Sequence, residues 1–561
     1  MAKAVLATQG VPVRRLILEC SATDRRKAAI PIGASTLKGG KWSYPPDEIV
    51  VQMLQHEFGE ELELTPQVQE WFDQRIEWRH LMAERQVIEE EVEVPIPWSK
   101  DLFDYQRTMV RYGSEAKCFI NADDRGLGKT LEAISVAENV HASKVLIVCP
   151  GYLKLGWARE LKRWANVDAF VARGERATRE KIIASMANSK EPKRYLVVNY
   201  EMLRPKKASG GYPELLTMDW DMVIYDEAHR LKGRQSQWTE GAKKLSKVSR
   251  TQFLTGNPID SSPDDIWQLL NLIDPVKFSS YWAFVEYYCN IVDNFFGKEI
   301  AGVNPARMSQ LQYTLQPYVL RRLKQDVAPF LPDKIHHTIE VELEGSQKTF
   351  YTRLEKQMVI ELENGDLELV PQLTAKHLRL QQAIANPAIL GGKDDSVIER
   401  TTMELLSDIM DGADKCIVGT WFVPAADRLE EKIGAHYKVF RVRADQKDVQ
   451  RDAVVEAFKK CKEKCVLVGT IRTMGEGLNI DECDYTILTD KAWTPLANEQ
   501  FEDRTHRIDS TRTKHYFNIV VKDTVSADKE EVLQSRIEAR DEIWSMRQVA
   551  LKMIQRAHGN S

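Results

Sequence analysis

The stretch NADDRGLGKTLEAI, residues 121–134, contains a glycine-rich turn and the start of a helical pattern, and it directly follows a short apolar segment. The apolar residues just before it predict the end of a short buried strand, and apolar positions after the glycines recur at helical spacing, so a helix is expected to begin near Lys129. A strand, a glycine-rich turn and a helix N-terminus together bind phosphate, because backbone N–H groups and the positive end of the helix dipole face the anion. Gly126 and Gly128 let the chain approach that anion without a Cβ clash.

The stretch departs from the general phosphate-binding pattern G-x-x-x-x-G-K-[ST] at its first position, which is Asp123. Lys129 is nevertheless placed to reach the terminal phosphates of a nucleotide, and the hydroxyl of Thr130 to join the ligands of a magnesium ion. The alternative is a plain helix start whose lysine is only solvated. Local sequence alone leaves both interpretations open.

A second pattern, VIYDEAH at residues 223–229, favours the nucleotide site. An apolar strand brings Asp226 and Glu227 to its carboxyl end, where open α/β sheets bind their ligands. Asp226 is predicted to hold magnesium, and Glu227 to orient or deprotonate the attacking water. An acidic helix cap would explain these residues in isolation, but not their occurrence downstream of a phosphate cradle.

Short apolar runs, rich in valine and isoleucine, recur along the chain with helical patterns between them. Runs of this kind are typical of parallel strands that are buried on both faces. They predict an α/β fold with two parallel-sheet lobes in tandem. The runs are 144–150, 195–200, 221–229 and 252–258 in the first half, and 415–422, 438–444, 464–470 and 485–490 in the second.

Composition indicates a globular intracellular protein. The 561 residues are 43% hydrophobic and 29% charged, enough for about three or four domains with full cores. Eight scattered cysteines favour a reducing compartment, and no apolar run approaches the length of a membrane span, so no membrane association is expected. The net charge of −5 does not itself indicate nucleic-acid binding, although a basic groove can lie on an acidic body.

DDRGLGKT followed by DEAH resembles the ATPase core of Swi/Snf-type DNA translocases of helicase superfamily two. In that family the first motif commonly has no glycine at its first position, so Asp123 fits, whereas Arg125 stands where methionine is usual. The resemblance extends over most of residues 98–545 and implies two RecA-like lobes, ATP and Mg²⁺ as cofactors, and double-stranded or branched DNA as partner.

The resemblance also assigns roles to individual residues. Nucleotide contacts are implied for Gln106, Asp123, Gly126, Leu127, Gly128, Lys129, Thr130, Gly475 and Gly477. DNA contacts are implied for Lys154, Thr255, Gly256, Thr470, Asn479 and Trp493, and coupling between the two sites for His229. Arg504 and Arg507 are implied to stabilise the phosphoryl-transfer transition state; as residues three apart on a helix, they could instead form surface salt bridges. Asn257 replaces a threonine of the family pattern, and Asp509-Ser510 replace Gly-Gln.

Four regions are expected. Residues 1–97 form a small α+β domain, similar in outline to the HARP-type domain of annealing helicases, with Trp42, Lys38 and Lys41 as candidates for gripping branched DNA; a plain packing domain is the alternative. The other regions are a first lobe at 98–332 with a helical protrusion at about 263–317, a second lobe at 333–525 with a helical protrusion at about 345–400, and a C-terminal brace helix at 526–561.

The resemblance therefore implies an ATP-dependent double-stranded DNA translocase, a monomeric motor that remodels or rewinds forks or displaces bound proteins. One alternative is a strand-separating DNA or RNA helicase. Another is a non-catalytic DNA-junction binder, against which the presence of Lys129, Asp226, Glu227, Arg504 and Arg507 argues. The expected location is the cytoplasm or nucleoid in a bacterial or viral setting, and the nucleus in a eukaryote.

Overall fold

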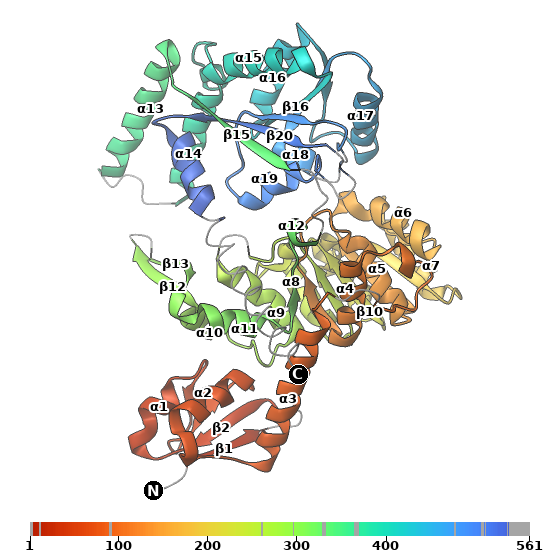
Figure 1. Ribbon diagram of the computed structural model, residues 1–561, viewed down its shortest axis with the longest axis vertical. Coiled ribbons are helices and arrows are strands. Elements are labelled where there is room, and N and C mark those ends of the chain that lie inside the picture. The colour runs from red at the N-terminus through yellow and green to blue at the C-terminus, as the bar shows by residue number, and fades with distance from the viewer. Residues whose placement is uncertain are drawn as a thin grey trace. The chain divides into compact units, whose positions relative to one another are not determined.

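The computed structural model of the protein describes residues 4–9, 13–88, 92–259, 262–294, 297–327, 333–363, 370–475, 478, 480–506, 510, 512–535 and 537. The chain forms two compact units that divide between Leu323 and Lys324, with residues 125–127 grouped with the second. The first contains the N-terminal region and the first lobe, and the second contains the second lobe. Figure 1 labels the helices and strands of the two units.

The first lobe is built on a seven-stranded sheet in which every pairing is parallel, with the strand order β14-β6-β11-β10-β7-β9-β8. This confirms the four apolar runs predicted in this half. Two strands were not predicted, β8 and β14, because a two-residue strand carries no readable periodicity. The strands are β6 Cys118–Asn121, β7 Lys144–Cys149, β8 Phe170–Val171, β9 Arg194–Asn199, β10 Met222–Asp226, β11 Thr251–Leu254 and β14 Val319–Leu320.

Helices cover both faces of this sheet, so successive residues of each strand enter different cores. On β10, Val223 packs with one core and Ile224 with the other, and both are fully buried. This explains the continuous apolar runs, since the period-two side-chain alternation finds a core on either side. The helices are α4 Asp104–Ala116, α5 Lys129–Asn139, α6 Lys154–Ala165, α7 Arg176–Asn188, α8 Gln237–Leu245 and α9 Trp267–Ile273.

The protrusion of the first lobe is not wholly helical, which corrects the prediction for residues 263–317. After α10 (Tyr281–Tyr288) the chain forms an antiparallel hairpin, β12 (Cys289–Asn294) with β13 (Gly297–Val303), before α11 (Met308–Leu315). β-Branched residues concentrate in this hairpin and favour extended backbone, whereas the aromatic run before it is compatible with a helix.

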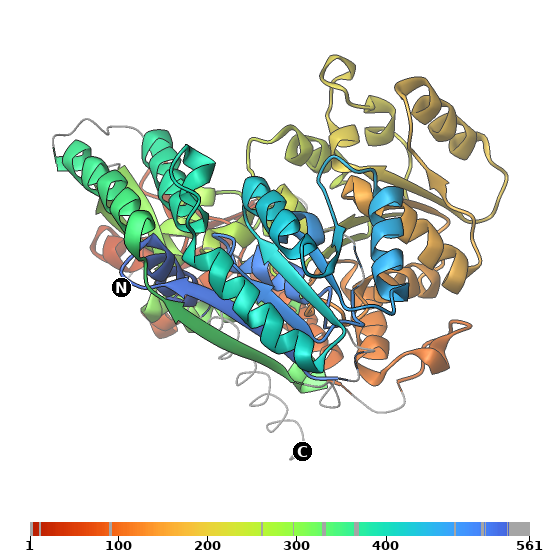
Figure 2. The ribbon, with the colours of Figure 1, turned by 90° about the horizontal axis from the view of Figure 1, so that it is seen from above.

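The second lobe has a six-stranded parallel sheet in the order β15-β20-β19-β16-β18-β17. The four predicted runs are again confirmed. The long β15–β20 pair at the edge, green beside blue in Figure 2, was missed because neither strand is a continuous apolar run: β15 mixes partly buried with exposed residues, and β20 mixes buried with partly buried ones. The strands are β15 Lys334–Val341, β16 Lys415–Thr420, β17 Lys438–Arg441, β18 Cys465–Thr470, β19 Tyr485–Leu488 and β20 Lys514–Val521.

Helices of the second lobe include a long pair in the predicted protrusion. The helices of the second lobe are α12 Lys324–Val327, α13 Gly345–Glu363, α14 Val370–Ala385, α15 Val397–Gly412, α16 Val423–Gly434, α17 Asp448–Lys460, α18 Ile471–Gly475 and α19 Pro495–Glu502, and the long pair is α13 and α14. Of the predicted brace helix, residues 525–535 are helical, and Lys529 donates to the carbonyl oxygen of Lys491 at 2.9 Å. The remainder lies almost wholly outside the described residues. No helix among the described residues is long and apolar enough to cross a membrane.

The N-terminal region is a small α+β fold, as predicted. Its sheet has the order β3-β4-β2-β1-β5 and is antiparallel except for the β1–β5 pair. The elements are β1 Ala4–Gln9, β2 Arg15–Glu19, α1 Arg25–Ala29, β3 Ser35–Thr36, β4 Trp42–Tyr44, α2 Glu48–Phe58, β5 Leu62–Leu64 and α3 Pro66–Arg85. Helix α3 serves two cores, because Val68 packs in the N-terminal core and Met82 in a core of the first lobe.

Buried charges fasten the N-terminal region to the first lobe. Glu48, fully buried on α2, pairs with Arg79 of α3 at 3.0 Å and with Lys277 of the lobe at 2.9 Å. Lys277 also pairs with Asp47 at 3.0 Å, and Arg75 donates to the hydroxyl of Tyr318 at 2.8 Å. Because removing one member of a buried ion pair costs about 3–5 kcal/mol, these contacts hold the two parts in a defined arrangement.

Candidate nucleotide-binding site

The predicted phosphate cradle has the expected backbone. Strand β6 ends at Asn121 and α5 begins at Lys129, with Gly126 and Gly128 at φ angles of 83° and 89° between them. Only glycine adopts such angles freely. A Cβ atom on Gly128 would lie 2.5 Å from Nε2 of Gln106, so this residue, predicted to contact nucleotide, packs directly against the loop.

Asp123 fixes the shape of the cradle from within. Its carboxylate is fully buried and accepts hydrogen bonds from the backbone N–H of Arg322 at 2.9 Å and from its Nε at 3.0 Å. The same guanidinium donates to the carbonyl oxygen of Tyr105 and to Glu132 of α5, the latter at 3.1 Å. One arginine therefore ties together the Gln106 segment, the loop and the helix that follows it. The predicted contact of Asp123 with nucleotide stays a prediction.

Glu132 completes this buried cluster. It accepts a hydrogen bond from Nδ2 of Asn121 at 2.8 Å, and Oδ1 of Asn121 in turn accepts from the backbone N–H of Asp123 at 3.1 Å. Burial, reinforced by the charge of Asp123, raises the pKa of Glu132 although Arg322 opposes this. Sequence reasoning missed Arg322 and Glu132 as parts of the site. The sequence offered only a weak signal, the adjacent Arg321 and Arg322 after the apolar pair Val319-Leu320.

Lys129 lies over the cradle with its ammonium held by the loop. Its Nζ donates to the carbonyl oxygens of Asp123 at 2.7 Å and of Asp124 at 3.0 Å. Leu254 of β11 pairs with both Asn121 at the end of β6 and Asp226 at the end of β10, so the two predicted motifs lie at the same edge of the sheet. Two motifs far apart in sequence thus form one site.

Asp226 ends strand β10 in a largely desolvated position. Its Oδ2 accepts a hydrogen bond from Nε1 of the buried Trp157 at 2.8 Å, and its Oδ1 accepts from the backbone N–H of Glu227 at 2.9 Å. Burial raises the pKa of Asp226 to about 6, and the charge of Glu227 adds to this effect. A partly buried pair of neighbouring carboxylates with this electrostatic cost is suited to receiving a cation.

Glu227 has an unusual backbone. Its φ and ψ of 53° and 49° lie in the left-handed region, which costs a non-glycine residue about 1–3 kcal/mol. Its carboxylate lies 3.2 Å from Nδ1 of His229, the residue expected to couple the sites. Such strain commonly marks functional positions, where the surrounding structure maintains it.

The donor set fits a magnesium ion held together with nucleotide phosphates. Thr130 follows Lys129 in the first turn of α5, and Asp226 supplies carboxylate oxygen next to the cradle. Magnesium usually takes one or two carboxylates plus substrate phosphates and water. The described part of the chain contains no cluster of three or more His, Cys, Asp or Glu able to hold a metal.

The predicted DNA contacts of the first lobe are mostly buried. Lys154 is 8% exposed, and its Nζ donates to the carbonyl oxygen of Ala172 at 2.7 Å and to Oδ1 of Asn199 at 3.1 Å. Thr255, 1% exposed, donates its backbone N–H to the carbonyl oxygen of Asn121, so the segment containing Thr255 and Gly256 lies beside the cradle. The DNA roles of these three residues stay predictions.

In the second lobe, the segment that contains Gly475 contacts the segment that contains Arg504. Nε of Arg504 donates to the carbonyl oxygen of Gly475 at 3.0 Å, and the carbonyl oxygen of Arg504 accepts from the backbone N–H of Ile480 at 2.9 Å. Thr470 exchanges a 2.7 Å hydroxyl hydrogen bond with Thr473 at the end of β18. Gly477, Asn479 and Arg507 lie outside the described residues.

Trp493 is held within the second lobe. Its Nε1 donates to Oε1 of Gln381 at 3.3 Å, and Nζ of Lys529 lies 5.5 Å from the centre of its ring. Both contacts come from segments outside the motif that contains Trp493. Its predicted DNA contact stays a prediction.

A phosphate cradle and a DEAH carboxylate pair on one parallel sheet, followed by a second parallel-sheet lobe, define the helicase class of nucleotide-hydrolysing proteins. Two protein-family matches identify the family within this class. Residues 105–389 match the SNF2-related domain, and residues 401–509 match the helicase conserved C-terminal domain. The first match covers just over half of the chain, so the chain belongs to the SNF2-related domain family.

Curated relatives are similar over the motor region. Chromodomain-helicase-DNA-binding protein 6 of Homo sapiens is 26% identical over 447 residues, covering 72% of this chain and 16% of the relative. Chromodomain-helicase-DNA-binding protein 7 of Homo sapiens is 25% identical, covering 72% of this chain and 14% of the relative. Chromodomain-helicase-DNA-binding protein 8 of Danio rerio is also 25% identical, covering 72% of this chain and 17% of the relative. The chain thus spans about a sixth of the length of these relatives.

A solved structure, the Sulfolobus solfataricus SWI2/SNF2 ATPase core in complex with dsDNA, is 22% identical to this chain. It matches with a TM-score of 0.37, covering 81% of this chain and 96% of that one. None of the relatives named here is a HARP-type or annealing helicase, so that branch stays a prediction.

Proposed function

We propose that the protein is an ATP-dependent translocase on double-stranded DNA, which remodels or rewinds forked and branched DNA or displaces proteins bound to it. The observation that supports this best is that one parallel sheet carries both the glycine-rich cradle, which Arg322 preshapes, and the Asp226–Glu227 pair at the end of β10. Family membership adds DNA as the polymer on which the energy of hydrolysis acts.

Each residue of the cradle has a distinct part. On nucleotide binding, Lys129 exchanges its two carbonyl partners for phosphate oxygens, which are stronger, charge-assisted acceptors. Asp226 and Thr130 hold the magnesium ion, whose charge neutralises that of the phosphates. Glu227 orients the attacking water or takes its proton. Gln106, packed against Gly128, is in position to test the base of the nucleotide.

Arg504 and Arg507 are proposed to stabilise the negative charge that develops on the transferred phosphoryl group in the transition state. An arginine in this role contributes about 10³–10⁵ in rate. A nucleotide that binds one conformation of the motor more tightly than another shifts the balance between them, and hydrolysis reverses the shift. Repeating this cycle while gripping a DNA backbone produces movement along the duplex.

The N-terminal region is proposed to direct the motor to branched DNA. Lys38 is exposed, whereas Lys41 pairs with Glu19, and Trp42 packs partly against the N-terminal core. Lys38 is therefore the best candidate of the three for a DNA contact. Replacing Trp42 removes core contacts as well, so Lys38→Glu tests the role of this surface with less risk to the fold.

The test compares ATP hydrolysis with blunt duplex, forked DNA, single-stranded DNA and RNA at one salt concentration. The proposal predicts strong stimulation by duplex and forked DNA, and little by RNA. Stimulation by single strands or RNA alone would instead identify a strand-separating helicase. A rate that no nucleic acid changes would contradict the proposal.

A further inference from the structure

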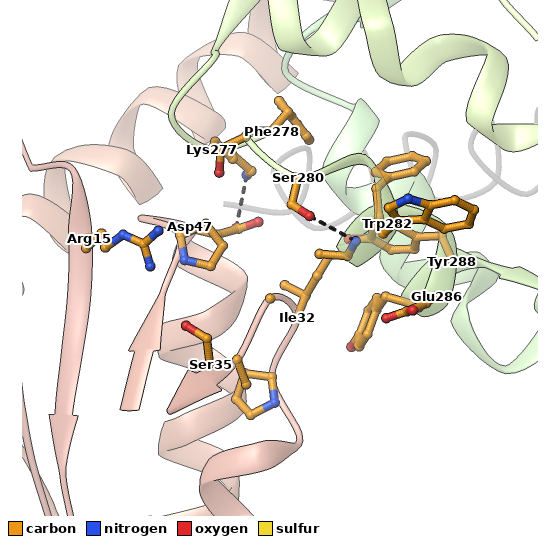
Figure 3. Close-up of a pocket in the computed structure, with 18 of the residues that line it drawn as sticks. Arg15, Ile32, Ser35, Asp47, Lys277, Phe278, Ser280, Trp282, Glu286 and Tyr288 are labelled. Carbon is orange, nitrogen blue, oxygen red and sulfur yellow. Dashed lines mark hydrogen bonds and ion pairs between the residues drawn. The ribbon is translucent and has the colours of Figure 1, made fainter. Parts of the chain in front are cut away.

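A cavity outside the nucleotide site lies where the N-terminal region meets the protrusion of the first lobe (Figure 3). Its volume is about 530 Å³, within the range of pockets that hold small ligands, and such pockets favour domain junctions. One wall comes from the segment 29–35 and the start of β2, and the other from residues 277–288, which lead into and form α10. None of the residues assigned to the nucleotide site lines it.

Buried contacts hold the two walls together. The ion pair of Asp47 with Lys277, 3.0 Å long, joins one wall to the other. Gly33, at a φ of 68°, turns tightly against Pro45 of the same wall, and a Cβ atom there would be in van der Waals contact, at 3.9 Å, with Cβ of Ala283 on the other wall. Ile32 packs against the cores of both parts. The cavity is therefore a preformed feature of this unit.

The rim presents a large aromatic surface to solvent. Trp282, at the beginning of α10, is 55% exposed although the neighbouring Phe284 is buried. The indole meets Tyr281 edge to face, with their ring centres 5.3 Å apart. An exposed tryptophan beside a cavity is a platform on which a planar group can stack.

Positive charge lies on the opposite wall. Arg14 and Arg15 are both exposed lining residues, and Nη1 of Arg15 donates to the hydroxyl of Ser43 at 2.8 Å. Neither guanidinium forms an ion pair with any carboxylate of the described residues. The charges of Asp47 and Lys277 cancel in their ion pair. Of the other lining residues, Glu286 carries one negative charge and the two arginines carry two positive charges. The excess charge is complementary to an anion.

We infer that this cavity takes an unpaired nucleotide segment of DNA, with a base stacked on Trp282 and its phosphates drawn to Arg14 and Arg15. The inference rests on the proposed function, because a motor that works at forks meets unpaired strands there. Stacking on an aromatic side chain and arginine–phosphate attraction are the two contacts by which proteins hold single strands. In blunt duplex the bases are stacked on each other, so the cavity would favour forks.

The experiment measures the binding of a fluorescein-labelled oligothymidylate to the full-length protein by anisotropy, without ATP. Trp282→Ala is expected to weaken binding about tenfold, as the loss of one stacked base predicts, while Trp282→Phe keeps most of the affinity. R14E/R15E should weaken it by at least as much. The matched control is R25E/R26E, a neighbouring exposed pair on α1 that does not line the cavity.

Two further readouts separate this inference from the proposed function. ATP hydrolysis stimulated by blunt duplex should be unchanged in all four variants, because the cavity lies outside the nucleotide site; absence of stimulation in the wild type contradicts the proposed function and not the cavity. Unaltered oligothymidylate affinity in Trp282→Ala and R14E/R15E, with folding confirmed by thermal melting, overturns the inference. Displacement of the oligothymidylate by poly-glutamate at equal charge concentration also overturns it, in favour of an acidic peptide.

Discussion

The two lobes share a fold but keep their functional residues in different ways. In the first lobe three site residues are fixed by contacts with other segments of the lobe: Asp123 by Arg322, Asp226 by Trp157, and Gln106 against Gly128. In the second lobe Arg504 is anchored through one nitrogen to the carbonyl oxygen of Gly475. The first lobe therefore provides a rigid phosphate cradle, and the second provides charge on longer side chains. Variants in the two lobes should differ accordingly in how they affect binding and turnover.

The largest effect is expected from the arginines of the second lobe. Arg507→Ala should lower kcat by about 10³-fold or more while changing KM for ATP little, because the contribution of an arginine finger arises mainly in the transition state. Steady-state kinetics with saturating duplex DNA measures this, with Arg507→Lys as the charge-conserving comparison. A raised KM with unchanged kcat would assign Arg507 to ground-state binding, and Arg504→Ala would then be tested for the finger role.

Next in size is the loss of the general base. Glu227→Gln should reduce turnover by about 10²–10⁴-fold and leave ATP binding intact, whereas Lys129→Ala should weaken binding as well. Nucleotide affinity measured with a fluorescent ATP analogue, alongside the hydrolysis rate, separates the two. Wild-type turnover in Glu227→Gln would show that another group activates the water.

A smaller effect, on stability and on KM, is expected from the anchor of the cradle. Arg322→Met leaves the carboxylate of Asp123 buried without its cation, which should cost about 3–5 kcal/mol of unfolding free energy and raise KM for ATP. Adding Asp123→Asn should recover part of the stability, since the uncompensated charge is removed. Denaturant unfolding measures both variants; equal stability of Arg322→Met and wild type would exclude the anchoring role.

The smallest effect concerns pH. Because the pKa of Asp226 is raised to about 6 from its ordinary value of 3.8, its proton is bound more tightly in the folded protein than in the unfolded one. Its contribution therefore lowers stability as the pH rises from about 4 to 6. Mg²⁺-dependent ATP binding should weaken as the pH falls through about 6, because the carboxylate must lose its proton to bind magnesium. Thermal melts and ATP titrations of wild type and Asp226→Asn across this range should show both trends in the wild type alone.

Local patterns predicted much of this structure. The phosphate cradle and eight strands, the DEAH strand among them, follow from residues adjacent in sequence, since most of these strands are buried on both faces and are continuous apolar runs. The partnership of Arg322 with Asp123 spans 199 residues and depends on β14, a strand too short to predict. The burial of Lys154 likewise follows from contacts with the ends of β8 and β9. What escaped prediction depends on long-range pairing, which single-sequence periodicity does not encode.

The central claim is that hydrolysis in the first-lobe cradle drives movement along double-stranded DNA. Displacement of a third strand from a triplex by the full-length protein tests it most directly, because a translocase removes that strand without separating the duplex. The account predicts ATP-dependent displacement by the wild type, none by Glu227→Gln, and an intact underlying duplex. Robust duplex-stimulated hydrolysis without displacement, or displacement accompanied by separation of the duplex strands, would contradict it.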